Sequence, residues 1–224
     1  MHSISLPESL AAVRQSIDRA AETAGRDPAG IELVAVSKTH PPETVREVAA
    51  AGQMLFGESR VQEARAKIPL LSSRLRWHFI GHLQSNKAKL VAPLVELVHT
   101  VDSETLGREL VKRASGGHLR VLIEVNIGGE SQKGGVAPES TLDLARALLV
   151  VPGLELSGLM CVPPAGQPAR PAFARLRELR DSLAASLGQP LPELSMGMSG
   201  DFEDAIEEGA TLVRVGTAIF SARG

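Results

Sequence analysis

Lys38 is the residue whose type and position most directly suggest covalent chemistry. It follows the run LVAVS, residues 33–37, and so stands at the carboxyl end of an expected buried strand. Such a strand would hold the lysine in a desolvated interior, which favours the neutral amine that attacks a carbonyl group. The alternative is that Lys38 leaves the strand for solvent at the edge of a loop. The position therefore predicts either a Schiff-base lysine or an ordinary surface lysine.

Two turns of small residues near the end of the sequence could bind an anion. The first is GMSGD, residues 197–201, and the second is VGTA, residues 215–218. Barrel proteins commonly bind phosphate in the loops after strands seven and eight, where small residues allow close approach to backbone N–H groups. The candidate phosphate ligands are Ser199, Gly200, Gly216 and Thr217. The alternative for the first turn is an ordinary helix start with Ser199 as its N-cap.

Arg214 is expected on the inner face of the last strand. Period-two alternation places Leu212, Arg214 and Gly216 on one face. A buried guanidinium is costly unless a carboxylate or a ligand accepts its hydrogen bonds. Arg214 therefore predicts either a buried ion pair or a ligand contact.

His78 and His82, in the run WHFIGHLQ, could suggest a metal site, because alternation along a strand would put them on one face. The pair lacks a third ligand, and no other cluster of histidine, cysteine or acidic residues accompanies it. We expect polar packing inside the fold and no metal.

These groups need a scaffold, and strand-like runs alternating with helical stretches supply one. The eight runs begin at Ile31, Met54, Arg76, Leu97, Leu119, Leu154, Leu191 and Thr211. Such alternation predicts parallel strands joined by helical crossovers. We predict an α/β fold with one domain over residues 1–224, a single (β/α)8 barrel of the TIM type, with an open doubly wound sheet as the alternative. Residues 31–224 would form the barrel, and residues 1–30 would add an N-terminal helix that covers a gap, because no helix is expected after the last strand.

Composition excludes several classes of partner. The 24 basic and 26 acidic residues are interspersed and give a net charge of −2, so we expect no nucleic-acid or anionic-lipid partner. The single cysteine, Cys161, cannot form an internal disulfide, which fits a reducing compartment. We find no signal-peptide pattern and no apolar run of membrane-spanning length. These features predict a cytoplasmic protein.

Seven motifs, in order along the chain, resemble those of the pyridoxal phosphate homeostasis proteins, a family similar in fold to the barrel domain of alanine racemase. The motifs are AVSKTHP (35–41), FGES.VQE (56–63), WHFIGHLQSNK (77–87), EVNIGGESQKGG (124–135), GLMCVPP (158–164), LSMGMSGDFEDAIEEG (194–209) and LVRVGTAIFSAR (212–223). Together they cover nearly the whole chain after residue 30.

The resemblance implies a pyridoxal 5'-phosphate (PLP) cofactor bound as a Schiff base at Lys38. It also implies a pyridine nitrogen that faces Arg214 and a phosphate in the two small-residue turns. The sequence departs from the family at Ser59 and Arg60, where Asn-Tyr is usual, so an asparagine contact would become a shorter Ser59 contact or a water bridge. This departure would alter the affinity for the cofactor rather than the role of Lys38.

Three functions fit these residues: a PLP carrier that holds a lysine aldimine without turnover, a weak PLP-dependent amino-acid racemase, and an aldolase-type enzyme for a phosphorylated substrate. A protonated Arg214 beside the pyridine nitrogen would weaken the cofactor as an electron sink. The racemase resemblance needs a tyrosine from a second domain, and this chain has no tyrosine. We therefore expect a mainly monomeric carrier that acts in cofactor and amino-acid homeostasis, with apo PLP-dependent enzymes as its partners.

Overall fold

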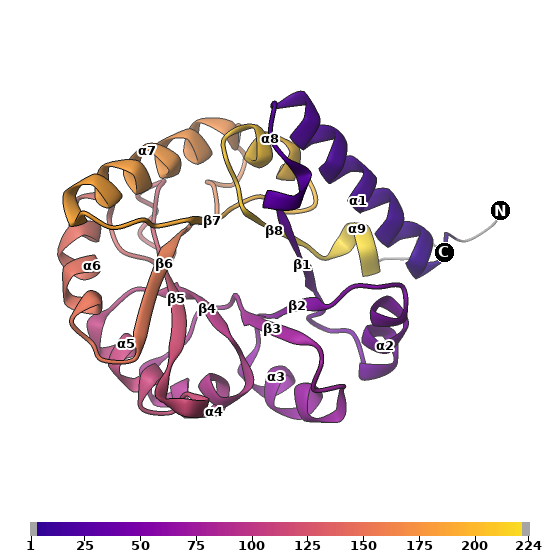
Figure 1. Cartoon of the computed structure of the whole chain (residues 1–224), viewed down its shortest axis with the longest axis horizontal. Coiled ribbons are helices and arrows are strands. Elements are labelled where there is room, and N and C mark those ends of the chain that lie inside the picture. Colours follow the sequence, from indigo (N-terminus) through magenta and orange to yellow (C-terminus); the bar gives the residue numbers. More distant parts are fainter. Residues whose placement is uncertain (1–3, 221–224) are drawn as a thin grey trace.

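The computed structural model describes residues 4–220 as a closed barrel of eight parallel strands surrounded by helices (Figure 1). Each strand pairs with the next one in the sequence, and β8 pairs with β1 so that Val34 lies opposite Arg214. The predicted (β/α)8 barrel is confirmed, and the open sheet is wrong. Residues 1–3 and 221–224, which the predicted ranges include, lie outside the described residues.

The strands are short and their side chains are largely buried. They are β1 (Glu32–Val36), β2 (Leu55–Glu58), β3 (Arg76–Phe79), β4 (Leu97–Val101), β5 (Leu119–Glu124), β6 (Leu154–Met160), β7 (Glu193–Ser195) and β8 (Leu212–Val215). Six strands each contribute one residue to a separate apolar cluster, which consists of Val34, Leu55, Leu97, Leu122, Met160 and Leu212. Side chains from strands all around a ring can meet only on its axis, so this cluster fills the barrel interior.

Helices cover the outside of the barrel. The α-helices are α1 (Leu6–Thr23), α2 (Pro42–Ala50), α3 (Val61–Lys67), α4 (Ala88–Val91), α5 (Glu104–Val111), α6 (Thr141–Leu149), α7 (Arg170–Leu187), α8 (Phe202–Glu207) and α9 (Thr217–Phe220). Short 3-10 helices are η1 (Pro28–Gly30), η2 (Ile68–Leu70), η3 (Ser85–Lys87), η4 (Ala92–Leu94), η5 (Ser115–Gly117) and η6 (Pro138–Ser140). None of the helices within residues 4–220 is both long and apolar enough to cross a membrane.

The additional N-terminal helix is present as α1. It begins with a capping box in which the Ser5 and Glu8 side chains each bond the other residue's backbone N–H, and it buries Leu10, Val13 and Ile17. Figure 1 shows α1 running along the outside of the barrel beside α8 and α9, both of which it contacts. This is where we expected the helix to cover a gap.

One expectation about the last strand is wrong, because a helical turn follows it. The run TLVRVGTAIF is apolar enough to look like one strand, but β8 ends at Val215. The Gly216 carbonyl accepts hydrogen bonds from the N–H groups of Ile219 and Phe220, both at 2.9 Å. Residues 217–220 therefore form the single turn α9.

Candidate functional site

The barrel brings most of the predicted site residues to one part of its carboxyl end. They are Lys38 after β1, Ser59 after β2, Ser199 and Gly200 after β7, and Gly216 and Thr217 after β8. The strands β7, β8, β1 and β2 are consecutive neighbours in the closed sheet. Residues distant in sequence thus share one end of adjacent strands, where functional groups of such barrels usually lie.

Lys38 lies in a turn beyond β1 and its side chain is exposed. The expectation of a desolvated interior lysine is therefore wrong. The strand ends at Val36 and Ser37 is the last buried residue, so the chain has already reached the barrel mouth at Lys38. The amine is therefore accessible to solvent at the barrel mouth.

The residues on both sides of Lys38 are held by three side chains, which we call the α3 clamp: Glu63 and Lys67 of α3, and Glu58 of β2. Lys67 Nζ donates to the Ser37 carbonyl at 2.7 Å and to Glu58 Oε1 at 2.5 Å. The Ser37 hydroxyl donates to the same carboxylate oxygen at 2.7 Å. On the other side, the Thr39 N–H donates to Glu63 Oε2 at 2.6 Å. The clamp therefore holds the turn that carries Lys38.

Thr39 adopts a conformation that needs such support. Among residues 4–220 it is the one non-glycine residue with a positive φ, at 69°. A β-branched residue in this region is strained, and strain of this kind persists where the surroundings hold it in place. The hydrogen bond from Thr39 to Glu63 supplies part of that restraint.

Glu58 and Lys67 form a buried ion pair between the barrel and α3. Burial raises the pKa of Glu58 and outweighs the opposing hydrogen bonds from Lys67 and Ser37. Its second oxygen, Oε2, has no hydrogen-bond partner among the described residues. The carboxylate therefore depends on Lys67 for its charge compensation.

The two small-residue turns lie against each other. The Ala218 N–H donates to Ser199 Oγ at 3.4 Å, and a cavity of about 680 Å³ is lined by Ser199, Gly200, Thr217, Ala218 and residues of α1. A Cβ at Gly216 would lie 3.2 Å from the Val36 carbonyl oxygen, so glycine allows the end of β8 to approach β1 closely. Hydroxyl and backbone donors thus surround a solvent-open cavity.

The N-cap alternative for Ser199 is wrong. The helix α8 begins at Phe202 and its N-cap is Asp201, whose carboxylate instead accepts the Met198 N–H at 2.6 Å. The Ser199 hydroxyl is turned toward α9. Glu203 also lines the cavity and is exposed, so its carboxylate can turn to solvent away from an anion.

Arg214 is buried, at 4% exposure, and points into the barrel interior on the same face as Leu212. It donates to Ser195 Oγ at 2.6 Å and to the Cys161 carbonyl at 3.0 Å. Within residues 4–220 no carboxylate pairs with it, so the predicted ion pair is wrong. Burial lowers the pKa of Arg214 and raises that of the Cys161 thiol to about 12, which keeps the thiol protonated.

His78 and His82 do not share a face. The strand β3 ends at Phe79, and the chain turns at Gly81, where a Cβ would lie 2.0 Å from the Ser59 carbonyl oxygen. His82 is consequently exposed, whereas His78 is buried. In the part of the chain that the structure describes, no three His, Cys, Asp or Glu side chains are grouped to hold a metal.

The sequence interpretation missed the α3 clamp and the buried neighbours of Arg214. The spacing of Glu63 and Lys67 is a signal for a pair on one helix face, but it does not indicate that Lys67 is buried. Alternation in β4 places His99 on the same face as Leu97, which was a usable signal for an inward histidine. Nothing in the sequence joins Lys67 to Ser37, or His99 to Ser195.

The residues present suit a ligand with a reactive carbonyl, a phosphate and a hydrogen-bond acceptor on a ring. Lys38 supplies an accessible amine for the carbonyl. The turns at Ser199 and Thr217 supply hydroxyl and backbone donors for the phosphate. Arg214 supplies charged N–H donors at the inner side of the same strand ends.

Comparison with curated proteins gives full-length relatives. Proteins named pyridoxal phosphate homeostasis protein from Aquifex aeolicus and Pseudomonas aeruginosa are 47% and 48% identical to this chain. The matches cover 96% of this chain and 97% of the Aquifex protein, and 97% of this chain and 96% of the Pseudomonas protein.

Solved structures and a family model agree with these relatives. PipY from Synechococcus elongatus PCC7942 with PLP bound is similar with a TM-score of 0.79 and 36% identity, over 92% of this chain and 100% of PipY. Alanine racemase from Corynebacterium glutamicum shares the fold, with a TM-score of 0.69 and 20% identity over 94% of this chain and 61% of the racemase. The family model for the alanine racemase N-terminal domain matches residues 9–224. The chain therefore belongs to the alanine racemase N-terminal domain family and, within it, to the pyridoxal phosphate homeostasis proteins.

Proposed function

We propose that this chain binds PLP as an aldimine of Lys38 and acts in PLP and amino-acid homeostasis without catalytic turnover. The observation that carries the proposal is the convergence of Lys38 and the two small-residue turns at the ends of neighbouring strands. The relative PipY, whose structure has PLP bound, supports the choice of cofactor.

Each part of the cofactor has a proposed partner in this chain. Lys38 binds the aldehyde carbon, and Arg214 faces the pyridine nitrogen. Ser59 contacts the cofactor from the end of β2. The phosphate is held by Ser199, Gly200, Gly216 and Thr217.

Two features of the residues support the proposed absence of turnover. Arg214 keeps its proton, so a guanidinium beside the pyridine nitrogen disfavours the pyridinium form on which carbanion chemistry depends. A weak racemase is the alternative function, but the chain has no tyrosine to act as an acid or base on the second face of the cofactor.

Lys38→Ala tests the covalent site. We expect the wild-type protein with PLP to show a visible aldimine band, and borohydride reduction to fix the cofactor on Lys38 as measured by peptide mass mapping. Lys38→Ala should lose the band and keep its fold, whereas Lys87→Ala, which changes a lysine beside Ser59, should retain both. A reducible aldimine on another lysine in Lys38→Ala contradicts the assignment. Exchange of amino-acid α-hydrogen above the rate for free PLP contradicts the absence of turnover.

The phosphate assignment has its own test. Pyridoxal, which lacks the phosphate, should bind far more weakly than PLP, because the contacts of the two turns serve only the phosphorylated form. Titration of the protein with both vitamers measures the difference. Equal dissociation constants would remove the anion site.

We also propose that residues 1–224 work as one cytoplasmic unit, mainly monomeric, that passes PLP to apo PLP-dependent enzymes. A racemase-like dimer would draw on contacts outside the barrel, whereas the described residues 4–220 form one barrel and its covering helices. Sedimentation at low protein concentration should give the mass of one chain, and a tight dimer would count against the proposal.

A further inference from the structure

A continuous line of buried polar side chains crosses the barrel from its amino end to Arg214. His78 Nε2 lies 3.2 Å from Glu96 Oε1, and His78 Nδ1 lies 2.9 Å from His99 Nε2. His99 Nδ1 lies 2.7 Å from Ser195 Oγ. Ser195 Oγ in turn accepts a hydrogen bond of 2.6 Å from the Arg214 guanidinium. We call His78, His99 and Ser195 the relay, since they join Glu96 to Arg214.

Counting donors and acceptors fixes the direction of every bond in the relay. An ionised Glu96 can only accept, so His78 carries its proton on Nε2. Burial lowers the pKa of His78 and holds that of His99 well below its usual range, so both rings are neutral. His78 Nδ1 is then an acceptor, His99 must donate from Nε2, and His99 Nδ1 must accept from the Ser195 hydroxyl. The hydrogen of Ser195 is committed to His99, and its lone pairs are left for Arg214.

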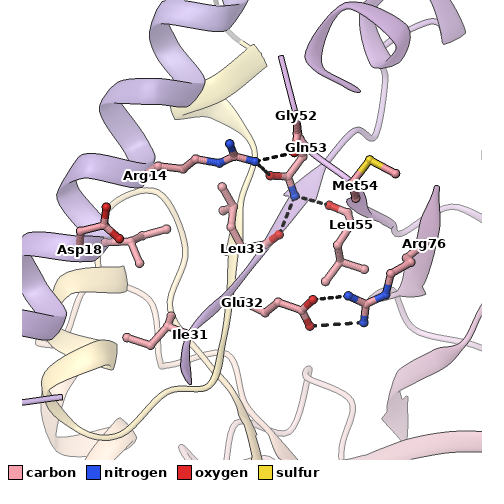
Figure 2. A pocket seen from close by; sticks show the side chains of 11 residues that line it. Arg14, Asp18, Ile31, Glu32, Leu33, Gly52, Gln53, Met54, Leu55 and Arg76 are labelled. Atoms are coloured by element: carbon pink, nitrogen blue, oxygen red, sulfur yellow. Dashed lines mark hydrogen bonds and ion pairs between the residues drawn. The ribbon is translucent and has the colours of Figure 1, made fainter. Parts of the chain in front are cut away.

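The far end of the relay is anchored at the opposite mouth of the barrel. Arg76 donates to Glu96 at 2.8 Å through Nε, and it pairs with Glu32. Figure 2 shows the Glu32–Arg76 pair in a cavity of about 340 Å³, which also contains the hydrogen-bonded side chains of Arg14 and Gln53. Glu96 therefore remains an anion held by a neighbouring cation.

The relay stabilises the buried guanidinium of Arg214 without a direct ion pair. Each relay residue turns its acceptor atom toward Arg214 and donates its own hydrogen toward Glu96. The aligned dipoles therefore stabilise the guanidinium, and the balancing carboxylate stays at the other end of the barrel. The bonds to Ser195 and Cys161 use two of the five N–H groups of Arg214 and leave the others for a ligand.

We propose that Ser195, His99 and His78 are positioning residues that orient Arg214 toward the cofactor through a one-directional hydrogen-bond relay anchored at Glu96. This inference rests on the proposed PLP function, because Arg214 is the relay's contact with the cofactor. It assigns a role to residues in the interior that touch no part of the cofactor themselves.

The first measurement needs no variant and no cofactor. Side-chain ¹⁵N NMR of the full chain should show His78 and His99 as neutral rings protonated on Nε2. Protonation of His99 on Nδ1, or an imidazolium at either position near neutral pH, overturns the relay.

The second measurement uses Ser195→Ala, which removes one hydroxyl group from the middle of the relay. We expect its dissociation constant for PLP to rise about tenfold, the size expected from losing a hydrogen bond to a charged group, and the visible aldimine band to shift. Ser195→Thr restores a hydroxyl and should recover most of the affinity. Ser157→Ala is the matched control, because Ser157 is also a buried strand serine that accepts from an arginine, Arg120, outside the relay.

The outcomes separate this inference from the proposed function. A Ser195→Ala protein with an unchanged band and a dissociation constant within about twofold of wild type overturns the relay's role at the cofactor. An equal loss in Ser157→Ala also overturns it, because the effect would then be general destabilisation. If the wild-type chain forms no aldimine on Lys38, the proposed function fails and so does the relay's role at the cofactor, while the NMR result still decides the direction of its bonds.

Discussion

At the scale of single residues, Lys38 combines an exposed side chain with a fixed backbone. Ser37 and Thr39 are each held by hydrogen bonds to β2 or α3, whereas the side chain of the lysine between them is exposed. A threonine in the left-handed region costs on the order of 1–3 kcal/mol, and the α3 clamp offsets part of this cost. A fixed turn limits the positions that the amine can reach, which favours reaction with a ligand bound in one orientation.

The buried pair within the clamp makes a prediction about stability. Lys67→Met should lower the free energy of unfolding by about 3–5 kcal/mol, because Glu58 would remain buried without its cation. Adding Glu58→Gln should recover much of that loss, since a neutral amide needs no counter-charge. Urea unfolding of the single and double variants measures both effects.

The control for the buried Glu58–Lys67 pair is an ion pair nearby that lies closer to solvent. Arg60 pairs with Glu63 in solvent, and Arg60→Met should change the unfolding free energy by less than about 1 kcal/mol. A cost of Lys67→Met no larger than that of Arg60→Met would show that the buried pair does not stabilise the turn.

At the scale of elements, periodicity predicts the barrel but not where its strands end. The eight repeats follow from local alternation, and all eight predicted runs contain the observed strands. The strand ends depend on register with neighbours and on close approaches such as that of Gly81 to Ser59, which are not local in sequence. This is why the exposure of Lys38 and of His82 could not be predicted.

The contacts that complete the candidate site are even less local. Lys67 and Ser37 are 30 residues apart, and His99 and Ser195 are 96 apart. Residue type and strand position were enough to predict the candidate residues, but only the closed sheet brings them together. Local spacing could indicate a Glu63–Lys67 pair and an inward His99, but it could not indicate the distant partners that complete the clamp and the relay.

The helix α1 makes a prediction about packing. Leu10 lies on the buried face of α1 and is 1% exposed. Leu10→Ala should therefore lower the free energy of unfolding by about 2–5 kcal/mol. Val150 is 70% exposed, and Val150→Ala should change it by less than about 0.5 kcal/mol. Thermal and urea unfolding compare the two variants. Equal effects would mean that α1 does not form part of the stable core.

At the scale of the whole molecule, the barrel separates opposite charges along its axis. Arg214 lies near the carboxyl end, whereas Glu96 lies at the amino end beside Arg76. Burial alone would raise the pKa of Glu96, but hydrogen bonds from His78 and Arg76 and the charge of Arg76 outweigh it and lower the pKa to about 2. The anion at the foot of the barrel is thus stabilised by the fold.

This shift predicts how acid affects the protein. The folded-state pKa of Glu96 lies below its ordinary value of 4.5, so its contribution to stability is present above about pH 4.5 and is lost as the pH falls toward about 2. Glu96→Gln should therefore be less stable than wild type near neutral pH, and the difference should shrink on acidification. Urea unfolding across this range measures the difference. If the difference in unfolding free energy stays constant or widens at low pH, Glu96 is not the group that causes the loss of stability in acid.

The closure of β8 onto β1 also dictates when the molecule can fold during synthesis. Arg26 donates to the Ile206 carbonyl across 180 residues of sequence, and α1 packs on α8 and α9. At about 5–20 residues per second, a ribosome needs roughly 10–40 s to make the stretch that separates these partners. Throughout that interval the apolar face of α1 and one edge of β1 have no partner to cover them. The segments that are synthesised first are therefore exposed for the longest time and depend most on chaperones.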